Sequence, residues 1–361
     1  MQTEYIFQSF FFFAFGLALT YALMPSVINV VKVRRLFEKR NDRSSHQQPT
    51  PSFGGVAVYI SLLLSLSYAE HLFEGDLSIY LITGLTVLFF VGLKDDLTGI
   101  SPFNKLLAQW LAASFIFLSP QFQIHDFHGF FGMHQIHVWI YLPLAYLVVA
   151  FFVNAYNLID GIDGLSGMLG LLFSSGFTVF FLYFSEWVMF FTCLSLAGSL
   201  VAFLRFNLSN DKKIFLGDTG SLMLGFFFAL CVVELLAQDL PKPYGIAIQN
   251  FPYVLIALLF VPVLDSLRVF VVRIKEGRSP FSADRNHIHH VIMDYFEWSH
   301  LRTSLFITFL NLFVFIFFFV ISIIANQWLV ALILLALVVS FSIWLTRLRR
   351  KRDAQIRQTH V

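Results

Sequence analysis

The sequence NAYNLIDGIDG, residues 154–164, places two carboxylates and two amides directly after a long apolar run. If this stretch forms the first turns of a helix, Asp160 and Asp163 lie on one face together with Asn157. The interleaved glycines remove side-chain bulk, so that backbone N–H groups and a large ligand can come close. This arrangement predicts a site for a cation or a polyphosphate. The alternative is a loop of capping residues that only joins two helices.

The rest of the chain has the composition of a polytopic membrane protein. Of its 361 residues, 58% are hydrophobic, and the mean hydropathy is +0.75. Only two cysteines occur, Cys193 and Cys231, both within apolar runs, so neither a disulfide framework nor a thiolate metal site is indicated. The N-terminal MQTEYIFQSFFFF lacks the charged n-region and the cleavage site of a signal peptide, so we expect the first apolar run to be retained as a span.

The apolar runs predict an all-α fold with about eleven transmembrane helices, because each run is long enough to cross a bilayer as a helix. The predicted spans lie near residues 6–26, 53–69, 77–93, 105–120, 138–154, 165–184, 187–206, 219–237, 251–272, 303–323 and 327–346.

Basic residues predict how these spans are oriented. Loop 31–52 and the C-terminal segment 347–361 each carry six Lys or Arg residues. Placing both in the cytoplasm puts every Lys and Arg except Lys242 on that side, or at that end of a span, as the positive-inside rule requires. The N-terminus is then outside and the C-terminus cytoplasmic. Residues 1–346 are predicted to form one transmembrane domain with cytoplasmic loops 31–52, 94–105, 154–165, 207–218 and 273–302, and residues 347–361 a basic cytoplasmic tail.

Two further acidic motifs lie on the predicted cytoplasmic side. In KDD, residues 94–96, the adjacent Asp95 and Asp96 repel one another unless a cation or a proton compensates. The alternative there is an ordinary helix end, with Lys94 as an ion-pair partner. In FLGDTGS, residues 215–221, Asp218 lies between glycines at a helix start, which suits Mg²⁺ with phosphate oxygens. Asp218 could also serve only as an N-cap.

The longest polar segment of this side, RIKEGRSPFSADRNHIHH at residues 273–290, is rich in hydrogen-bond donors. Such a set suits phosphate or diphosphate oxygens. A zinc site is the competing interpretation, but no Cys accompanies the histidines, and an amphipathic interfacial segment is the structural alternative. The residues of this set are Arg278, Arg285, His287, His289 and His290, together with Ser282 and Asp284.

A pair of ionisable residues lies within span 251–272. Asp265 and Arg268 are three residues apart and can therefore pair on one helix face, either as functional groups or as a structural ion pair.

The four other motifs all fall on one predicted face of the membrane. Acidic metal ligands and basic phosphate ligands on that face predict chemistry on a cytosolic polyphosphate beside the bilayer.

The motifs TPSFGG, KDD, NAYNLIDGIDG, FLGDTGS, PVLD and SPFSADRNHIHH occur in this order between Pro51 and His290. In this they resemble the polyprenyl-phosphate N-acetylhexosamine-1-phosphate transferases, glycosyltransferase family 4, and specifically the branch that uses UDP-GlcNAc and undecaprenyl phosphate. The resemblance implies that the lipid phosphate attacks the β-phosphorus of the UDP-sugar, releases UMP and forms an undecaprenyl-diphospho-sugar. That is the first membrane step of cell-envelope glycan synthesis, such as lipopolysaccharide O-antigen, at the cytoplasmic face of the bacterial inner membrane.

The resemblance also implies roles for single residues. Asp218 and Asn157 would hold Mg²⁺, with Mn²⁺ as an alternative metal. Asp95 or Asp96 would position or deprotonate the lipid phosphate, and Asp160 and Asp163 would contact nucleotide or metal. The diphosphate oxygens would be bound by Arg285, His287, His289 and His290. The implied partners are a UDP-sugar, a polyprenyl phosphate and the membrane. A homodimer is left open, and no nucleic acid is expected.

Other functions predict different sequence features. The related branch that transfers phospho-MurNAc-pentapeptide ends this region in three histidines followed by Phe-Glu. Here the chain reads DRNHIHH, and Phe296–Glu297 come six residues after His290, so we expect UDP-GlcNAc as the donor. A proton-coupled transporter would carry acidic residues at mid-depth on broken helices. A hydrolase would need a nucleophile motif such as G-x-S-x-G or a metal motif such as H-E-x-x-H, and neither string is present.

Overall fold

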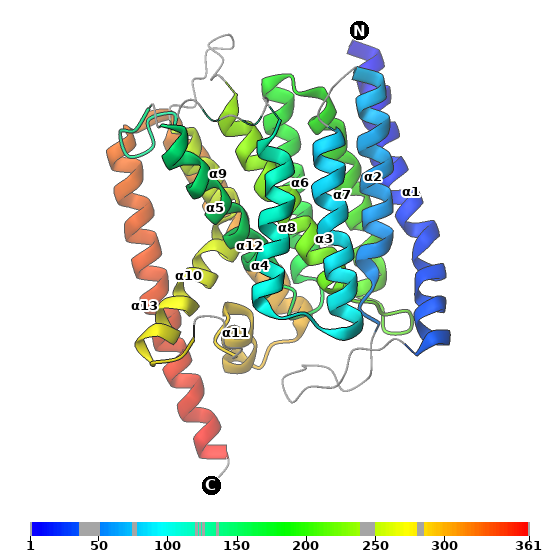
Figure 1. Cartoon of the computed structure of the whole chain (residues 1–361). Coiled ribbons are helices and arrows are strands. Elements are labelled where there is room, and N and C mark those ends of the chain that lie inside the picture. Colours follow the sequence, from blue (N-terminus) through cyan, green and yellow to red (C-terminus); the bar gives the residue numbers. More distant parts are fainter. Residues whose placement is uncertain are drawn as a thin grey trace. The chain divides into compact units, whose positions relative to one another are not determined.

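The computed structural model describes residues 2–35, 51–73, 78–119, 122, 124, 127–134, 137–238, 250–279 and 285–359. Within these ranges the regular structure is helical, as predicted, and Figure 1 shows the helices in chain order. Most of the predicted loop 31–52 lies outside the described residues, as do Lys242, Ser282 and Asp284. The chain divides into two compact units, of which the first comprises residues 1–125 and 136–239, and the second residues 126–135 and 240–361.

The first unit is a bundle of eight helices within the described ranges. Helix α8 is its most buried span, since 83% of its apolar window is enclosed by protein. It packs against α2, α3, α5 and α6, whereas α7 packs against α1, α2 and α6. The helices are α1 (Gln2–Arg34), α2 (Gly54–Phe73), α3 (Ser78–Thr98), α4 (Pro102–Phe117), α5 (Val138–Leu158), α6 (Leu165–Phe184), α7 (Trp187–Asn207) and α8 (Gly217–Ala237).

Two glycines bring α3 and the start of α8 into close contact. A Cβ atom on Gly92 of α3 would lie 2.4 Å from the backbone oxygen of Asp218, so a larger residue would force the helices apart. Gly217 has φ +75° and begins α8, and a Cβ atom there would lie 2.7 Å from Asp96 Oδ2 of α3 and 1.9 Å from the backbone oxygen of Ser52. Only glycine adopts this conformation in so little space. The FLGDTGS motif is thereby held against α3.

The TPSFGG motif supports the same turn from the other side. Phe215 N donates to Pro51 O at 2.7 Å, Gly54 N to Phe215 O at 2.8 Å, and Gly55 N to Leu216 O at 2.9 Å. These three backbone hydrogen bonds pair the segment before α2 with the segment before α8. The motif therefore positions the polypeptide that carries Asp218.

The second unit contains a broken helix where one straight span, 251–272, was predicted. Helices α9 (Phe251–Leu258) and α10 (Phe260–Lys275) meet at an angle of 77° (Figure 1). A break inside an apolar environment frees backbone groups that must find other partners. Asn311 supplies them, because its Nδ2 donates to Leu258 O at 2.7 Å and its Oδ1 accepts from Val261 N at 2.9 Å.

Three more helices complete the second unit: α11 (Ile288–Phe296), α12 (His300–Ile324) and α13 (Gln327–Thr359). Helix α13 continues without interruption through the segment predicted to be a separate basic tail, as Figure 1 shows. It packs against α9, α11 and α12. Residues 347–359 are thus part of a helix that belongs to this unit.

The number of membrane crossings stays a prediction. Among the described residues, eight helices are long and apolar enough to span a bilayer, and the broken pair α9–α10 would make nine. The two other predicted spans, 77–93 and 105–120, are helices α3 and α4. Helix α3 ends in the charged Lys94, Asp95 and Asp96, and α4 has 16 residues, fewer than the roughly 20 that a straight crossing needs.

Candidate active site

The first unit brings two of the predicted carboxylates together around a lysine. The ammonium of Lys105, from the first turn of α4, lies 2.7 Å from Asp218 Oδ2 and also contacts Asp95 Oδ2. Asp95 Oδ1 accepts from the backbone N of Ile100 at 2.5 Å. The ion-pair partner of the KDD motif is therefore Lys105, whereas Lys94 is exposed.

Asn157, at the end of α5, joins this cluster as predicted. Its Nδ2 donates to Asp218 Oδ1 at 2.7 Å and to Ser221 Oγ at 2.8 Å. One carboxylate oxygen of Asp218 thus contacts the Lys105 ammonium, and the other accepts from the Asn157 amide. Neither oxygen caps α8. The sequence alternative that Asp218 serves only as an N-cap is wrong.

The cap of α8 comes instead from Asp96. Its carboxylate accepts from the backbone N of Asp218 at 2.9 Å, from the backbone N of Thr219 at 2.9 Å and from Thr219 Oγ1 at 2.5 Å. A carboxylate at this position satisfies amides that have no partner within the helix and favours the positive end of the helix dipole. The two adjacent aspartates therefore differ in their contacts, with Asp95 facing Lys105 and Asp96 bound to the start of α8.

The environment shifts the pKa of both KDD carboxyls, which lie beyond the apolar run of α3. Burial and, after it, the nearby Asp218 carboxylate raise the pKa of Asp95 to about 6 against the opposing effect of Lys105. Burial and the Asp218 charge raise the pKa of Asp96 to about 7, although its hydrogen bonds to Thr219 and Asp218 oppose the shift. The cluster therefore concentrates negative charge where desolvation disfavours it, and a cation stabilises it.

The NLIDGIDG stretch does not form the first turns of a helix. Helix α5 ends at Leu158 and α6 begins at Leu165, so the two aspartates lie in the connecting turn. Ser166 Oγ donates to Asp160 Oδ1 at 2.5 Å, and Lys213 Nζ lies 2.6 Å from Asp163 Oδ2. The predicted common face of Asn157, Asp160 and Asp163 is therefore wrong, because the turn directs the three side chains to different partners.

The second unit contains a separate polar cluster, formed by residues 287–290 (the HIHH segment), the residues just before them and α10. Asp265 Oδ2 lies 2.8 Å from His287 Nδ1, and Asp265 Oδ1 accepts from Ile288 N at 2.9 Å and from Arg268 Nη2 at 2.8 Å. Arg268 Nη2 also donates to the backbone oxygen of Asn286. The predicted pairing of Asp265 with Arg268 is confirmed, and the pair in addition fastens the HIHH segment to α10.

The three histidines of this segment lie close to one another. The rings of His287 and His289 are 5.9 Å apart and nearly parallel, and the rings of His289 and His290 are 4.2 Å apart. Arg285 precedes them, and its Nη2 lies 3.1 Å from Asp294 Oδ1 of α11. The structure thus brings together all four residues that the sequence predicted to bind diphosphate oxygens.

Several buried nitrogens of this cluster have no hydrogen-bond partner among the described residues. They are Nδ1 of His289, Nδ1 of His290, and Nε and Nη1 of Arg268. Burial lowers the pKa of His289 well below its usual value and that of His290 to about 3, and neighbouring positive charges, Arg285 among them, act in the same direction. Both imidazoles are therefore neutral near pH 7. Buried donors without partners are costly, and an anionic ligand would satisfy them.

The sequence did not single out Lys105, Lys213, Arg273 and Arg352. Lys105 lies nine residues after Asp96, and nothing in an isolated basic residue at a helix start shows that it turns back toward the preceding helix. Arg273 Nη2 lies 3.4 Å from His287 Nε2, and Arg352, which contacts the backbone of Arg285, comes 67 residues later in the chain. Such pairings follow from tertiary packing, so no local pattern could have indicated them.

Comparison with known proteins agrees with the resemblance predicted from the motifs. Residues 78–236 match the model of Glycosyl transferase family 4. The undecaprenyl-phosphate alpha-N-acetylglucosaminyl 1-phosphate transferase of Salmonella typhi is 28% identical over 266 residues, which cover 72% of this chain and 69% of that protein. The decaprenyl-phosphate N-acetylglucosaminephosphotransferase of Mycobacterium leprae is 29% identical over 291 residues, which cover 74% of this chain and 72% of that protein. The predicted family resemblance is confirmed.

Proposed function

We propose that this chain, a relative of the polyprenyl-phosphate GlcNAc-1-phosphate transferases of glycosyl transferase family 4, transfers GlcNAc-1-phosphate from UDP-GlcNAc to undecaprenyl phosphate. An oxygen of the lipid phosphate attacks the β-phosphorus of the sugar nucleotide. The bond between that phosphorus and the oxygen bridging to UMP breaks, UMP leaves, and undecaprenyl-diphospho-GlcNAc remains. Such a reaction depends on in-line positioning and on charge neutralisation more than on covalent catalysis.

The observation that carries the proposal is the position of the Lys105 ammonium between Asp95 and Asp218. It marks a place where a positive group lies against two carboxylates at the start of a helix. These residues, together with Asn157, belong to the KDD, NAYNLIDGIDG and FLGDTGS motifs that are separated in sequence. An ion pair with only a structural role would not require residues from three separate motifs.

The donor set fits Mg²⁺. Among the described residues, no group of three or more His, Cys, Asp or Glu side chains is arranged to hold a metal ion. Mg²⁺ in phosphate-handling sites commonly uses one or two carboxylates, with substrate phosphates and water completing its octahedron. Asp218, with the amide oxygen of Asn157, would hold it here. When bound, the ion would neutralise charge on the diphosphate oxygens.

The other acidic residues divide into two groups by their contacts. Asp95 faces the cationic centre and is the better candidate to position the lipid phosphate, since both oxygens of Asp96 are engaged by the first turn of α8. Asp96 would act by holding Asp218 in place. Asp160 and Asp163 retain their proposed contact with nucleotide or metal, to be made from the turn between α5 and α6.

The basic cluster of the second unit would bind anionic oxygens of the sugar nucleotide. The unpartnered Nε and Nη1 of Arg268 are donors, and Nδ1 of His289 and of His290 can each donate in one tautomer, so the oxygens of a phosphate group could accept from them. The Arg285 side chain is 40% exposed, so its guanidinium can reach a ligand while it remains near Asp294. Guanidinium groups suit phosphate because their planar fork matches two oxygens at once.

The helices of membrane-spanning length, together with the bacterial relatives of the chain, indicate an integral membrane protein. We propose that it lies in the cytoplasmic membrane with both clusters facing the cytosol, because UDP-sugars are cytosolic and the basic segments follow the positive-inside rule.

The direct test is release of UMP by the purified full-length protein. Detergent-solubilised protein supplied with UDP-GlcNAc, undecaprenyl phosphate and Mg²⁺ should release UMP and form a lipid-linked sugar, and EDTA should stop both. Omission of the lipid phosphate controls for hydrolysis. If sugar nucleotide is consumed at the same rate without the lipid, or if no UMP appears with UDP-GlcNAc but does with UDP-MurNAc-pentapeptide, the proposed reaction is wrong.

A further inference from the structure

The last turns of α13, which lie in the predicted basic cytoplasmic tail, pack against other parts of the second unit. Arg352 is buried, with 6% of its surface exposed, whereas its neighbours Arg350 and Lys351 are exposed. A free cationic tail would expose all three residues. The burial of one of them indicates a specific contact.

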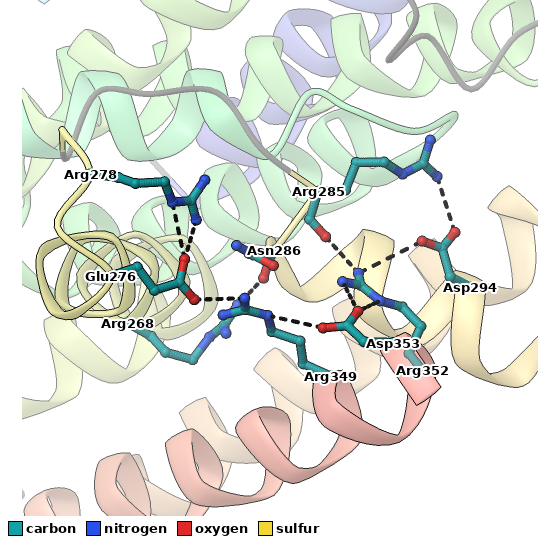
Figure 2. Close-up of polar contacts among 9 residues, drawn as sticks. All are labelled: Arg268, Glu276, Arg278, Arg285, Asn286, Asp294, Arg349, Arg352 and Asp353. Carbon is teal, nitrogen blue, oxygen red and sulfur yellow. Dashed lines mark hydrogen bonds and ion pairs between the residues drawn. The ribbon is translucent and has the colours of Figure 1, made fainter. Parts of the chain in front are cut away.

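Arg352 makes that contact with the segment that begins the HIHH motif (Figure 2). Its Nη1 donates to the backbone oxygen of Arg285 at 2.7 Å and lies 3.8 Å from Asp294 Oδ2. Its Nε and Nη2 bind Asp353 Oδ1 at 3.0 and 2.7 Å. The guanidinium is therefore oriented by its own helix on one edge and contacts Arg285 and Asp294 with the other.

Asp294 closes the arrangement, because it interacts with both arginines. Its Oδ1 lies 3.1 Å from Arg285 Nη2, and its Oδ2 faces Arg352. The backbone of Arg285 is thus held by Arg352 and its side chain by Asp294, as Figure 2 shows. Loss of Arg352 would free the Arg285 carbonyl and weaken the hold on Asp294 at the same time.

A second pair fastens α13 to the end of α10. Arg349 Nη2 lies 2.7 Å from Glu276 Oε1, and Glu276 also binds Arg278 (Figure 2). Glu276 directly follows α10, and Arg285 lies two residues before the HIHH motif, residues 287–290. Helix α13 therefore contacts the chain on both sides of the connection between α10 and α11.

From these contacts we propose that Arg352 is a positioning residue, which sets the place of Arg285 and the following histidines for the sugar nucleotide. The inference rests on the proposed function, since it gives a role to α13 in binding that substrate. Arg352 itself touches no substrate. It acts through the Arg285 backbone and through Asp294, and its planar fork makes these contacts with a geometry that a lysine cannot reproduce.

The test compares Arg352→Gln with Arg350→Gln in the full-length protein. Both substitutions remove one arginine from the same helix, but only the first removes the Arg285 contact. We expect Arg352→Gln to raise the KM for UDP-GlcNAc about tenfold, as loss of roughly one charge-assisted hydrogen bond implies, with a smaller change in kcat. We expect Arg350→Gln to leave both constants unchanged. A lowered kcat at unchanged KM for Arg352→Gln would overturn the proposal.

A double substitution separates positioning from general stability. In an Arg285→Gln background, Arg352→Gln should raise the KM much less than it does alone, because residues that act through one another are not additive. Because Arg285→Gln keeps the backbone oxygen that Arg352 binds, an equal rise in both backgrounds would mean that Arg352 does not position the Arg285 side chain, and would overturn that part of the proposal.

Amide hydrogen exchange gives a readout that needs no turnover. In Arg352→Gln, exchange should become faster in residues 285–296 and stay unchanged in α8, whereas Arg350→Gln should match the wild type in both. Unchanged exchange in 285–296 would overturn the proposal even if the enzyme is active. If the wild type releases no UMP, the proposed function fails, and the exchange experiment still decides whether Arg352 holds this segment.

Discussion

Removal of the Lys105 ammonium tests the central feature of the candidate active site. The substitution Lys105→Met keeps an unbranched apolar side chain that is one heavy atom shorter, but leaves Asp95 and Asp218 without their shared cation. Two carboxylates that share a small, partly buried space then repel one another. We therefore expect a less stable protein that depends more strongly on a divalent cation.

The size of the effect follows from the contact. At an effective dielectric constant of about 20, charges separated by the 2.7 Å between Lys105 Nζ and Asp218 Oδ2 attract by roughly 6 kcal/mol before desolvation is subtracted. The exposed fractions of the Lys105, Asp95 and Asp218 side chains are 19%, 9% and 29%, so the site is largely but not fully enclosed. Breaking it should cost about 3 kcal/mol, the lower end of what is found for buried pairs.

The assay is thermal unfolding of the purified protein in EDTA and in saturating MgCl₂. In EDTA, Lys105→Met should unfold several degrees below the wild type, and Mg²⁺ should raise its Tm by more than it raises that of the wild type. A ligand that binds the folded state alone stabilises it by mass action, and here the ion would no longer compete with an ammonium. UMP release should fall, because Lys105 also orients both carboxylates.

The matched control is Lys94→Met, which removes an exposed lysine of the same KDD motif. Its Tm should equal that of the wild type in both buffers. The reasoning is refuted if Lys105→Met has the wild-type Tm in EDTA, or if Mg²⁺ raises the Tm of both proteins equally.

Three further results are expected. Asp218→Asn should lower UMP release by about 100-fold or more, because it removes charge from a proposed metal ligand; near-normal turnover at low Mg²⁺ would contradict that role. When the pH is lowered from 7.5 to 5.5, the free energy of unfolding of His290→Asn should fall by about 1 kcal/mol less than that of the wild type. The reason is that the folded-state pKa of His290, about 3, lies below the unfolded value of 6.5, so the unfolded state binds the extra proton and stability falls as pH drops through 6.5; an unchanged pH dependence of unfolding would contradict it. Cysteines introduced at Ala354 and Gln238 should be labelled by an impermeant reagent from opposite sides of the membrane, and labelling of both from one side would overturn the predicted orientation.

The sequence predicted the helical architecture because apolar runs of bilayer length have few other solutions. It did not predict the break between α9 and α10. Leu258 and Val261 lie in an uninterrupted apolar run, and the side chain that satisfies their backbone groups, Asn311, comes about 50 residues later. A polar residue inside a predicted span, such as Asn311, indicates that its side chain has a hydrogen-bond partner. The sequence does not show which backbone groups are that partner.

The candidate site shows the same limit at the level of single residues. Motif spacing identified the residues that gather, including Asp218 with Asn157 and Arg285 with its histidines. It assigned their contacts incorrectly where a turn or a second helix intervenes, as at Asp160 and Asp163. Side-chain direction in a turn depends on backbone angles that residue type alone does not determine.

The KDD motif shows why adjacent residues of one kind can have different roles. Asp95 and Asp96 are about 100° apart around α3, because a helix turns once in roughly 3.6 residues. Since Gly92 lets α8 approach at the preceding turn, one of these directions meets the free amides of α8 and the other meets Lys105. The cap then fixes the backbone of Asp218, so that its side chain points toward the same lysine as Asp95 does. The Asp96 cap and the Lys105 ion pairs thus both depend on the close contact between α3 and α8 that Gly92 permits. A larger side chain at position 92 should therefore disturb both together.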